Sequence, residues 1–269
     1  MYARFKRSMS SETPKPSQLI EARLAQIDRR PFLGFVMTTA REVSPHADLF
    51  LTQNLLQLAI RCACLLDDFS ETDNTAFLKE FHKQKEYFYT LTPAHFHDEL
   101  REVENDVKQF FEEERSLALR IRGGDQFSWR DIQKYILGKS GDNLFYGKIL
   151  ELTTPGWTAD HTEGLRLQTI LFDIEKDIQD YSDDVPKGLP NVLYMGLTTT
   201  VKPENIPHDN PNAVSLATQV GLDRRLLYFA QMYRKKLADS VRITTPTLHD
   251  AIDKRYCEIQ AALQPVEPM

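Results

Sequence analysis

The amino-acid sequence predicts an all-helical protein. Glycine is scarce, with 11 residues in 269, so the segments between turn signals are long. Most of these segments carry apolar residues three and four positions apart, which is the period of an amphipathic helix. No set of segments alternates between apolar and polar residues as strands would. The length is ample for a sizeable hydrophobic core.

Local signals bound the expected helices. Ser128 and Asp131 resemble a capping box at a helix start. Gly123-Gly124 ends the charged helix expected over Pro93–Arg120. Pro155-Gly156 ends the helix expected over Ser128–Leu152. In chain order we expect helices over Ser17–Asp28, Pro45–Phe69, Asn74–Leu91, Pro93–Arg120, Ser128–Leu152, Ala159–Tyr181, Ala213–Thr244 and Thr247–Leu263. Residues 183–190 and 201–212 each hold several helix-breaking residues and are expected to be loops.

The ends and bulk composition exclude several classes of protein. Residues 1–16 are predicted to be a flexible tail and residues 17–269 a single domain, because the first residues are polar and basic with no apolar secretory core. No apolar stretch approaches the roughly 20 residues of a membrane span. Three cysteines, a low and odd count, suit a reducing cytoplasm. A net charge of -6 argues against a nucleic-acid partner.

The first of two acidic clusters follows the apolar run Leu55 to Leu66. Asp67 and Glu71 are four residues apart, and Asp68 and Glu71 are three apart, so the carboxylates share one helix face. Like charges this close repel each other, and a hard cation with oxygen ligands would relieve the repulsion. By itself, the cluster is equally typical of a helix end in solvent. Glu112-Glu113-Glu114-Arg115, in another helix, is typical of a solvated face.

The second acidic cluster consists of Asp173, Asp177, Asp180 and Asp184, which are spaced four, three and four residues apart. At about 100° per residue these side chains form one narrow stripe on an otherwise apolar helix. A solvated face explains the charge but not its confinement to a stripe. Neighbouring helices of an antiparallel bundle can bring such distant segments face to face. Two facing acidic walls would hold Mg²⁺ ions that bridge the oxygens of a diphosphate.

These segments resemble the class I isoprenoid synthase superfamily, which comprises trans-prenyltransferases, squalene and phytoene synthases, and class I terpene cyclases. Residues 66–71 resemble its first aspartate-rich motif and residues 172–181 its second. The segment Pro186 to Leu193 is similar to the one that follows the second motif in prenyltransferases. Lys139 to Phe145 is similar to their Lys-Thr stretch and helix break. The resemblance covers about residues 53–195 and implies a single-domain antiparallel bundle of the terpene synthase type with a central cavity.

In several places the chain departs from the family pattern, and these departures limit which substrates the resemblance implies. In the prenyltransferase register Lys176 replaces the first Asp of the second motif, which leaves Asp177 and Asp180. In the squalene and phytoene synthase register Asp173 and Asp177 form the pair instead, and both alignments remain open. No Arg-Arg-Gly follows the first motif, and no N-terminal Gly-Gly-Lys-Arg is present. In chain-elongating members those basic groups hold a second diphosphate, so their absence argues against such a substrate.

The resemblance therefore implies a Mg²⁺-dependent enzyme that ionises a prenyl diphosphate, releases diphosphate and cyclises or rearranges the allylic cation. Two alternatives stay open: a prenyltransferase that joins the chain to another acceptor, including head-to-head condensation, and a catalytically silent binding subunit. The substrate would be a prenyl diphosphate, and a homodimer would fit the family. The expected metal ligands are Asp67, Asp68, Glu71, Asp173, Asp177 and Asp180. Asp67, Asp68, Lys139 and Lys187 are the expected catalytic residues, the two lysines as an anion clamp.

The expected substrate pocket lies beside these motifs. In prenyltransferases the residues just upstream of the first motif often limit the depth of the pocket. Cys62 and Ala63 stand there in this chain, and the resemblance implies from their small size a deep pocket suited to a long prenyl chain. Aromatic faces attract cations and would stabilise the allylic cation. The candidates for that role are Phe69, Phe145, Tyr146 and Phe172.

Overall fold

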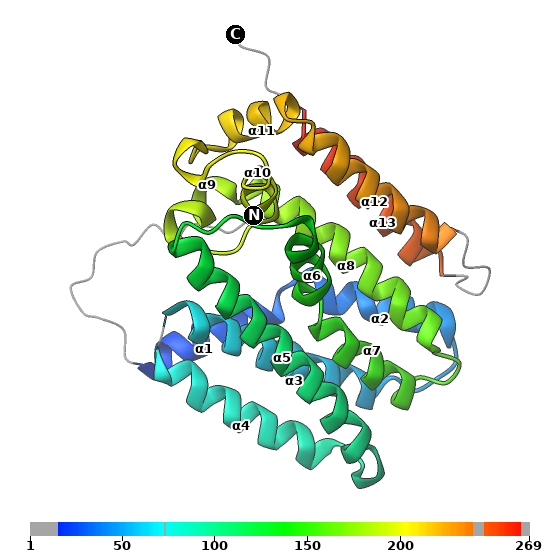
Figure 1. Ribbon diagram of the computed structural model, residues 1–269. Helices are drawn as coiled ribbons and strands as arrows, with labels where there is room; N and C mark the ends of the chain where they lie inside the picture. The colour runs from blue at the N-terminus through cyan, green and yellow to red at the C-terminus, as the bar shows by residue number, and fades with distance from the viewer. Residues whose placement is uncertain (1–15, 73, 239–244, 265–269) are drawn as a thin grey trace.

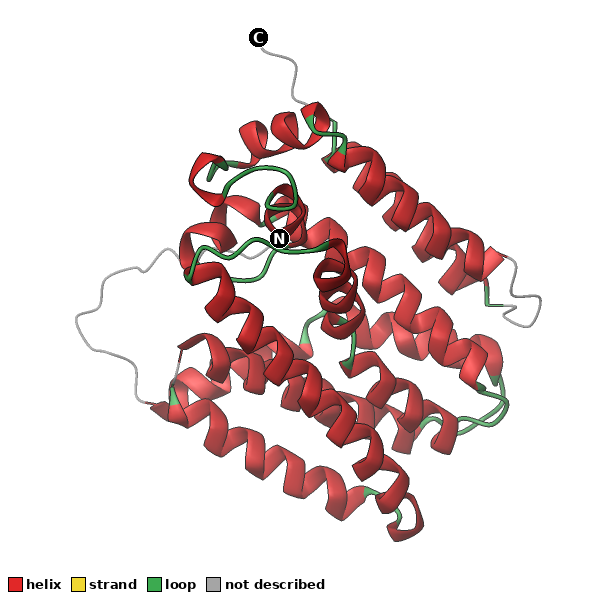
Figure 2. Ribbon diagram, viewed as in Figure 1, coloured by secondary structure: helices red, strands yellow, loops and turns green. Residues whose placement is uncertain are grey.

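A computed structural model describes residues 16–72, 74–238 and 245–264 of the chain. Every regular element within these ranges is a helix, which confirms the all-α prediction (Figures 1 and 2). The α-helices are α1 (Pro16–Asp28), α2 (Pro31–Val43), α3 (Phe50–Thr72), α4 (Thr75–Leu91), α5 (His97–Arg122), α6 (Trp129–Lys139), α7 (Asp142–Thr153), α8 (Ala159–Gln179), α9 (Tyr181–Asp184), α10 (Val192–Leu197), α11 (Asn210–Gln219), α12 (Leu222–Ala238) and α13 (Pro246–Ala262). Three short 3₁₀ turns are η1 (Ala94–Phe96), η2 (Val185–Lys187) and η3 (Pro203–Asn205).

Several expected boundaries agree with the structure because local chemistry sets them. The capping box before α6 is present: the backbone N–H of Asp131 donates to the Ser128 hydroxyl, and the Ser128 N–H donates to the Asp131 carboxylate. Asn74 caps α4 by accepting the N–H of Ala76 at 3.0 Å. None of the helices in the described ranges is both long enough and apolar enough to cross a membrane.

Four expectations about helix extent were wrong. Helix α2 was not predicted, although Pro31 stands at its first position, where a missing N–H costs nothing. The helix expected from Pro45 begins at Phe50, after a turn in which the Asp48 carboxylate accepts the Phe50 N–H. The helix expected from Ala213 is two helices, separated at Gly221, whose φ of 72° is left-handed. The loop expected over 183–190 contains α9 and η2.

A fifth difference, the position of a helix break, places the residues of the candidate site. The helix expected over Ser128–Leu152 is broken at Ser140 and Gly141 into α6 and α7. The ring of Phe110, from α5, lies against this break: a Cβ on Gly141 would stand 2.8 Å from its Cε2 atom, and one on Gly138 3.2 Å from its Cδ1 atom. The absence of side chains at both glycines therefore lets the aromatic ring pack directly on the backbone of the break.

Two large hydrophobic cores meet at this break. One core joins α6, the C-terminal part of α8 and helices α10 to α13. The other joins α2, α3, α7 and the start of α8. In Figure 1, α3 and α4 lie side by side at the bottom of the molecule, and α12 and α13 flank α8 at the upper right. Because α6 belongs to one core and α7 to the other, the residues at the break lie along the seam between them.

Candidate functional site

The first acidic cluster lies at the C-terminal end of α3, and its two aspartates have different surroundings. Asp68 is engaged by the Arg23 guanidinium of α1, whose Nε and Nη2 atoms each lie 2.6 Å from a carboxylate oxygen. The Asp67 carboxylate makes no hydrogen bond or ion pair with any described residue, although its backbone carbonyl accepts the Ser70 hydroxyl. Glu71 lies within α3, but its side chain is outside the described residues. Of the two described carboxylates of this cluster, Asp67 is therefore the one that is open to a ligand.

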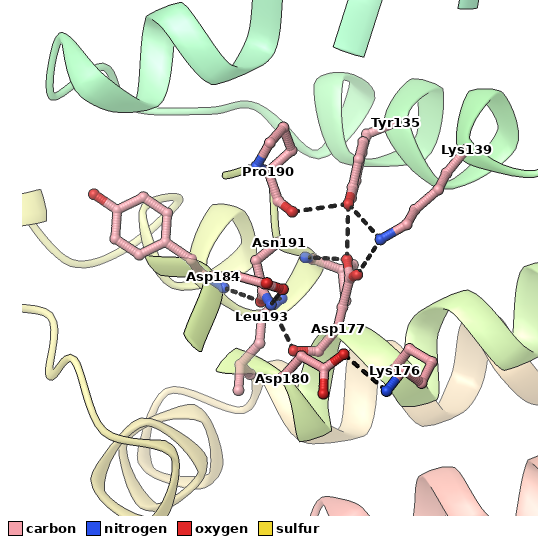
Figure 3. Close-up of polar contacts among 11 residues, drawn as sticks. Tyr135, Lys139, Lys176, Asp177, Asp180, Asp184, Pro190, Asn191 and Leu193 are labelled. Atoms are coloured by element: carbon pink, nitrogen blue, oxygen red, sulfur yellow. Dashed lines mark hydrogen bonds and ion pairs between the residues drawn. The ribbon is translucent and has the colours of Figure 1, made fainter. Parts of the chain in front are cut away.

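The second cluster is anchored by Asp177, which is 2 % exposed (Figure 3). Its carboxylate accepts the Tyr135 hydroxyl at 3.0 Å, the backbone N–H of Val192 at 2.7 Å and an N–H of the Lys139 ammonium. The Tyr135 oxygen also lies 3.0 Å from the carbonyl oxygen of Pro190. Asp177 thus ties α6 and α8 to the start of α10, and its hydrogen-bonding capacity is largely used by the protein itself.

The other carboxylates near the end of α8 also have protein partners. Asp180 pairs with Lys176 one turn earlier, at 2.8 Å. Asp184 accepts the side-chain amide of Asn191 at 3.2 Å, and burial raises the pKa of Asp184 to about 6. Lys176, the residue that departs from the family pattern, therefore neutralises the neighbouring carboxylate in the second motif.

Asp173 is the exception in the second cluster. Its Oδ2 atom is buried and has no hydrogen-bond partner among the described residues. Burial raises the pKa of Asp173 well above its usual range, while the nearby Lys139 ammonium opposes that rise. The pKa of Asp67 is likewise raised by the protein atoms crowded around it, although its side chain is accessible to solvent. Both carboxylates would gain from a cation, since neither has an ion pair.

Lys139, the last residue of α6, stands between the two clusters. Its charge acts on Asp67 from α3 and on Asp173 and Asp177 from α8. Burial alone would lower the pKa of Lys139, but Asp177 and the other acidic groups outweigh it and raise the pKa well above its usual value. Lys139 is therefore an ammonium ion at neutral pH, at the point where the seam between the cores meets the helix break.

Two further carboxylates join this group, and the sequence patterns did not single them out. Asp142 begins α7 and interacts electrostatically with Asp67 and Asp173; burial raises its pKa to about 6. Glu114 of α5 is partly buried and acts on Lys139 and Asp173, whereas Glu112 and Glu113 are exposed as expected. The position of Asp142 directly after the helix break was the available signal for it.

No group of three or more His, Cys, Asp or Glu side chains within the described ranges is arranged to hold a metal ion. Magnesium does not require such a cage: it is usually held by one or two carboxylates, waters and substrate phosphates. Asp67 and Asp173 supply two hard oxygen donors without protein partners, one of them with a buried orphan oxygen. The donor set fits Mg²⁺ in that manner, with Asp68, Asp177 and Asp180 engaged elsewhere.

The aromatic residues expected around the cation face different neighbours. Phe69 packs with the small cluster of α1, α3 and α4. The Phe145 ring lies 5.5 Å from that of Phe88 on α4, and the Phe172 ring lies under the Arg255 guanidinium of α13 at 4.6 Å. Only one of the four approaches the acidic group.

That residue is Tyr146, which is 3 % exposed and hydrogen-bonds to Asp142. Cys62 lies near Lys85 and Glu104, and burial raises the pKa of its thiol to about 12. Ala63 packs at the edge of the core around α3. Lys187 is exposed in η2 and has no described partner. The structure thus brings Asp67, Asp173, Asp177 and Lys139 together, and leaves most of the expected pocket residues apart from them.

No family model matches this chain, and searches of curated proteins and of solved structures found no match either. The chemistry of the residues around Lys139 is therefore the basis for a functional hypothesis.

Proposed function

We propose that this protein is a Mg²⁺-dependent enzyme of the class I terpene synthase kind, which ionises a prenyl diphosphate and cyclises or rearranges the resulting cation. The observation that carries the proposal is the convergence of α3, α6 and α8 on one partly buried ammonium ion, that of Lys139, flanked by the unpaired carboxylates of Asp67 and Asp173. A cation and two open carboxylates on a seam between two apolar cores suit a ligand with an anionic head and a hydrocarbon tail.

Lys139 is suited to bind the anionic head. An ammonium group has three N–H donors. Two of them serve Asp177 and the Tyr135 oxygen, which leaves one for an oxygen of the diphosphate. Tyr135 and Asp177 hold the lysine in place, so the charge would be preorganised where negative charge develops on the leaving group.

Asp67 and Asp173 would hold the metal from opposite walls. Bound Mg²⁺ would offset the charge of the departing diphosphate. The two carboxylates belong to different helices, α3 and α8, so they would also fix the distance between the walls. The apolar residues of both cores would keep water from the allylic cation.

Transfer of the prenyl chain to another acceptor is the second candidate function. A cavity of about 210 Å³ lies between α5 and α6 and ends at Tyr135 and Lys139, next to the proposed ionisation site. A cavity in this position offers room for a molecule other than the prenyl diphosphate.

The direct test is incubation of the full chain with prenyl diphosphates of ten to twenty-five carbons and Mg²⁺, with diphosphate release and hydrocarbon products measured. We expect D67N and D173N each to lower the rate of diphosphate release by about 100-fold or more, because each removes an open donor. Products formed without an added acceptor would favour cyclisation, and release only with an acceptor would favour transfer.

The matched control is D68N. It changes an adjacent aspartate whose carboxylate is held by Arg23, so it should retain most of the activity. Equal loss in D67N and D68N would contradict the assignment of Asp67. Absence of diphosphate release with every substrate, from a protein shown to be folded, would overturn the proposal and favour a catalytically silent subunit.

A further inference from the structure

The cavity between α5 and α6 has a composition that is unsuited to a hydrocarbon chain. Six of its eleven lining residues are charged, and they come from both helices. An apolar ligand would strip water from these charges without pairing them, which is costly. At about 210 Å³, the cavity is also smaller than the usual site for a drug-sized molecule. This composition suits a small polar molecule.

Two of these charges, both on solvent-exposed side chains, have no counter-ion among the described residues. Lys134, on α6, has no hydrogen bond or ion pair with any described residue. Glu113, on α5, accepts only the side-chain amide of Gln109 at 3.2 Å. By contrast, Arg120 and Asp131 at the same cavity pair with each other at 3.2 Å. The cavity thus offers one open positive charge and one open negative charge on facing helices.

Part of the remaining lining is apolar. Phe110 and Leu117 face the cavity from α5, and Gly138 faces it from α6. Because the Phe110 ring rests on the backbone at Gly138 and Gly141, it closes the cavity toward the helix break. A ligand that pairs with both open charges would place any side chain of its own against this wall.

We propose that this cavity binds a free amino acid with an apolar side chain. Its carboxylate pairs with Lys134, its ammonium group pairs with Glu113, and its side chain lies against Phe110. Charge-assisted hydrogen bonds of this kind are the strong ones in proteins, and a zwitterion carries both charges that pairing with Lys134 and Glu113 requires. The ligand stands next to the Lys139 ammonium but needs neither Mg²⁺ nor a prenyl diphosphate.

Calorimetric titration of the full chain with L-alanine, L-leucine and L-phenylalanine tests the proposal. We expect at least one of them to bind, and K134Q and E113Q each to weaken its binding about tenfold or more. K83Q is the matched control, since Lys83 is an exposed lysine of α4 outside the cavity. Circular dichroism would verify that each variant is folded.

Modified ligands separate the two charges. N-acetyl-leucine lacks the ammonium group, so its binding should respond to K134Q but not to E113Q. Leucine methyl ester lacks the carboxylate, so it should show the reverse. F110A should open the inner wall and shift preference from leucine toward phenylalanine.

The proposal fails if none of the three amino acids binds at millimolar concentration, or if K134Q, E113Q and K83Q all bind alike. The titrations contain no prenyl diphosphate, so their outcome is independent of the ionisation proposal. Diphosphate release without amino-acid binding would leave that function intact and remove this site; binding without diphosphate release would do the opposite.

Discussion

The two acidic clusters differ in where their charges are neutralised. In the first, on α3, the Arg23 side chain covers Asp68 near the surface, with both side chains about one-sixth exposed. In the second, on α8, the partly buried Lys139 side chain pairs with Asp177, whose own side chain is 2 % exposed. Each cluster nevertheless retains one carboxylate without a partner, Asp67 and Asp173.

This difference indicates that the clusters have unequal roles in stability. Removing one member of a deeply buried ion pair leaves an uncompensated charge in the interior, whereas a pair near the surface is replaced by water. The second cluster should therefore bear on folding and on ligand binding alike, and the first mainly on ligand binding. Three stability measurements, in order of expected effect, test this comparison.

The largest effect is expected from D177A. It removes the acceptor for the buried Tyr135 hydroxyl and Val192 N–H, and leaves the partly buried Lys139 ammonium without its closest counter-charge. We expect the free energy of unfolding, measured in denaturant, to fall by about 3–5 kcal/mol. D180A is the control, because Asp180 pairs only along one helix face with Lys176 and should cost about 0.5 kcal/mol. Similar losses in the two variants would contradict the anchoring role of Asp177.

Asp142, between the clusters, should have the next largest effect, and of opposite sign. Its pKa is raised from 3.8 to about 6 in the folded protein, so between these values the folded state binds more protons than the unfolded state. Stability then falls as the pH rises through this window, and the full cost is present above pH 6. We expect D142N to raise the free energy of unfolding by about 1–3 kcal/mol at neutral pH.

The gain from D142N should disappear below the unfolded-state pKa, where Asp142 is protonated in both states. Denaturant unfolding on either side of the window, at neutral pH and in mild acid, measures this dependence. A gain that is the same at both pH values would show that packing, rather than ionisation, is responsible.

The smallest effect is expected at the first cluster. R23A removes both hydrogen bonds to Asp68, and we expect a loss of about 1 kcal/mol because the pair lies near solvent. R23K keeps the charge but cannot form the bidentate contact, so its free energy of unfolding should lie between those of R23A and the unmodified protein. A loss in R23A as large as that in D177A would remove the distinction between the clusters.

Much of the helical fold follows from local signals. The apolar spacing predicts α1, α4, α8 and α13 to within about two residues, and the Ser128 capping box fixes the start of α6. The helix break at Ser140 and Gly141 is not dictated by apolar period, which continues through it. Only the resemblance of Lys139 to Phe145 to the helix break of prenyltransferases indicated it, and in the structure the Phe110 ring of a separate helix packs against it. The division at Gly221 is made by a left-handed glycine.

The sequence by itself determined that the chain is helical and that its carboxylates form two clusters on apolar helices. Only the tertiary structure decided which carboxylates have a protein partner and which can bind a ligand. Asp68 pairs with Arg23, 45 positions away in the chain, and Asp177 pairs with Lys139, 38 positions away. Spacing along one helix reports which side chains share a face. It does not report which distant charge folds against that face, because packing of the two cores sets that contact.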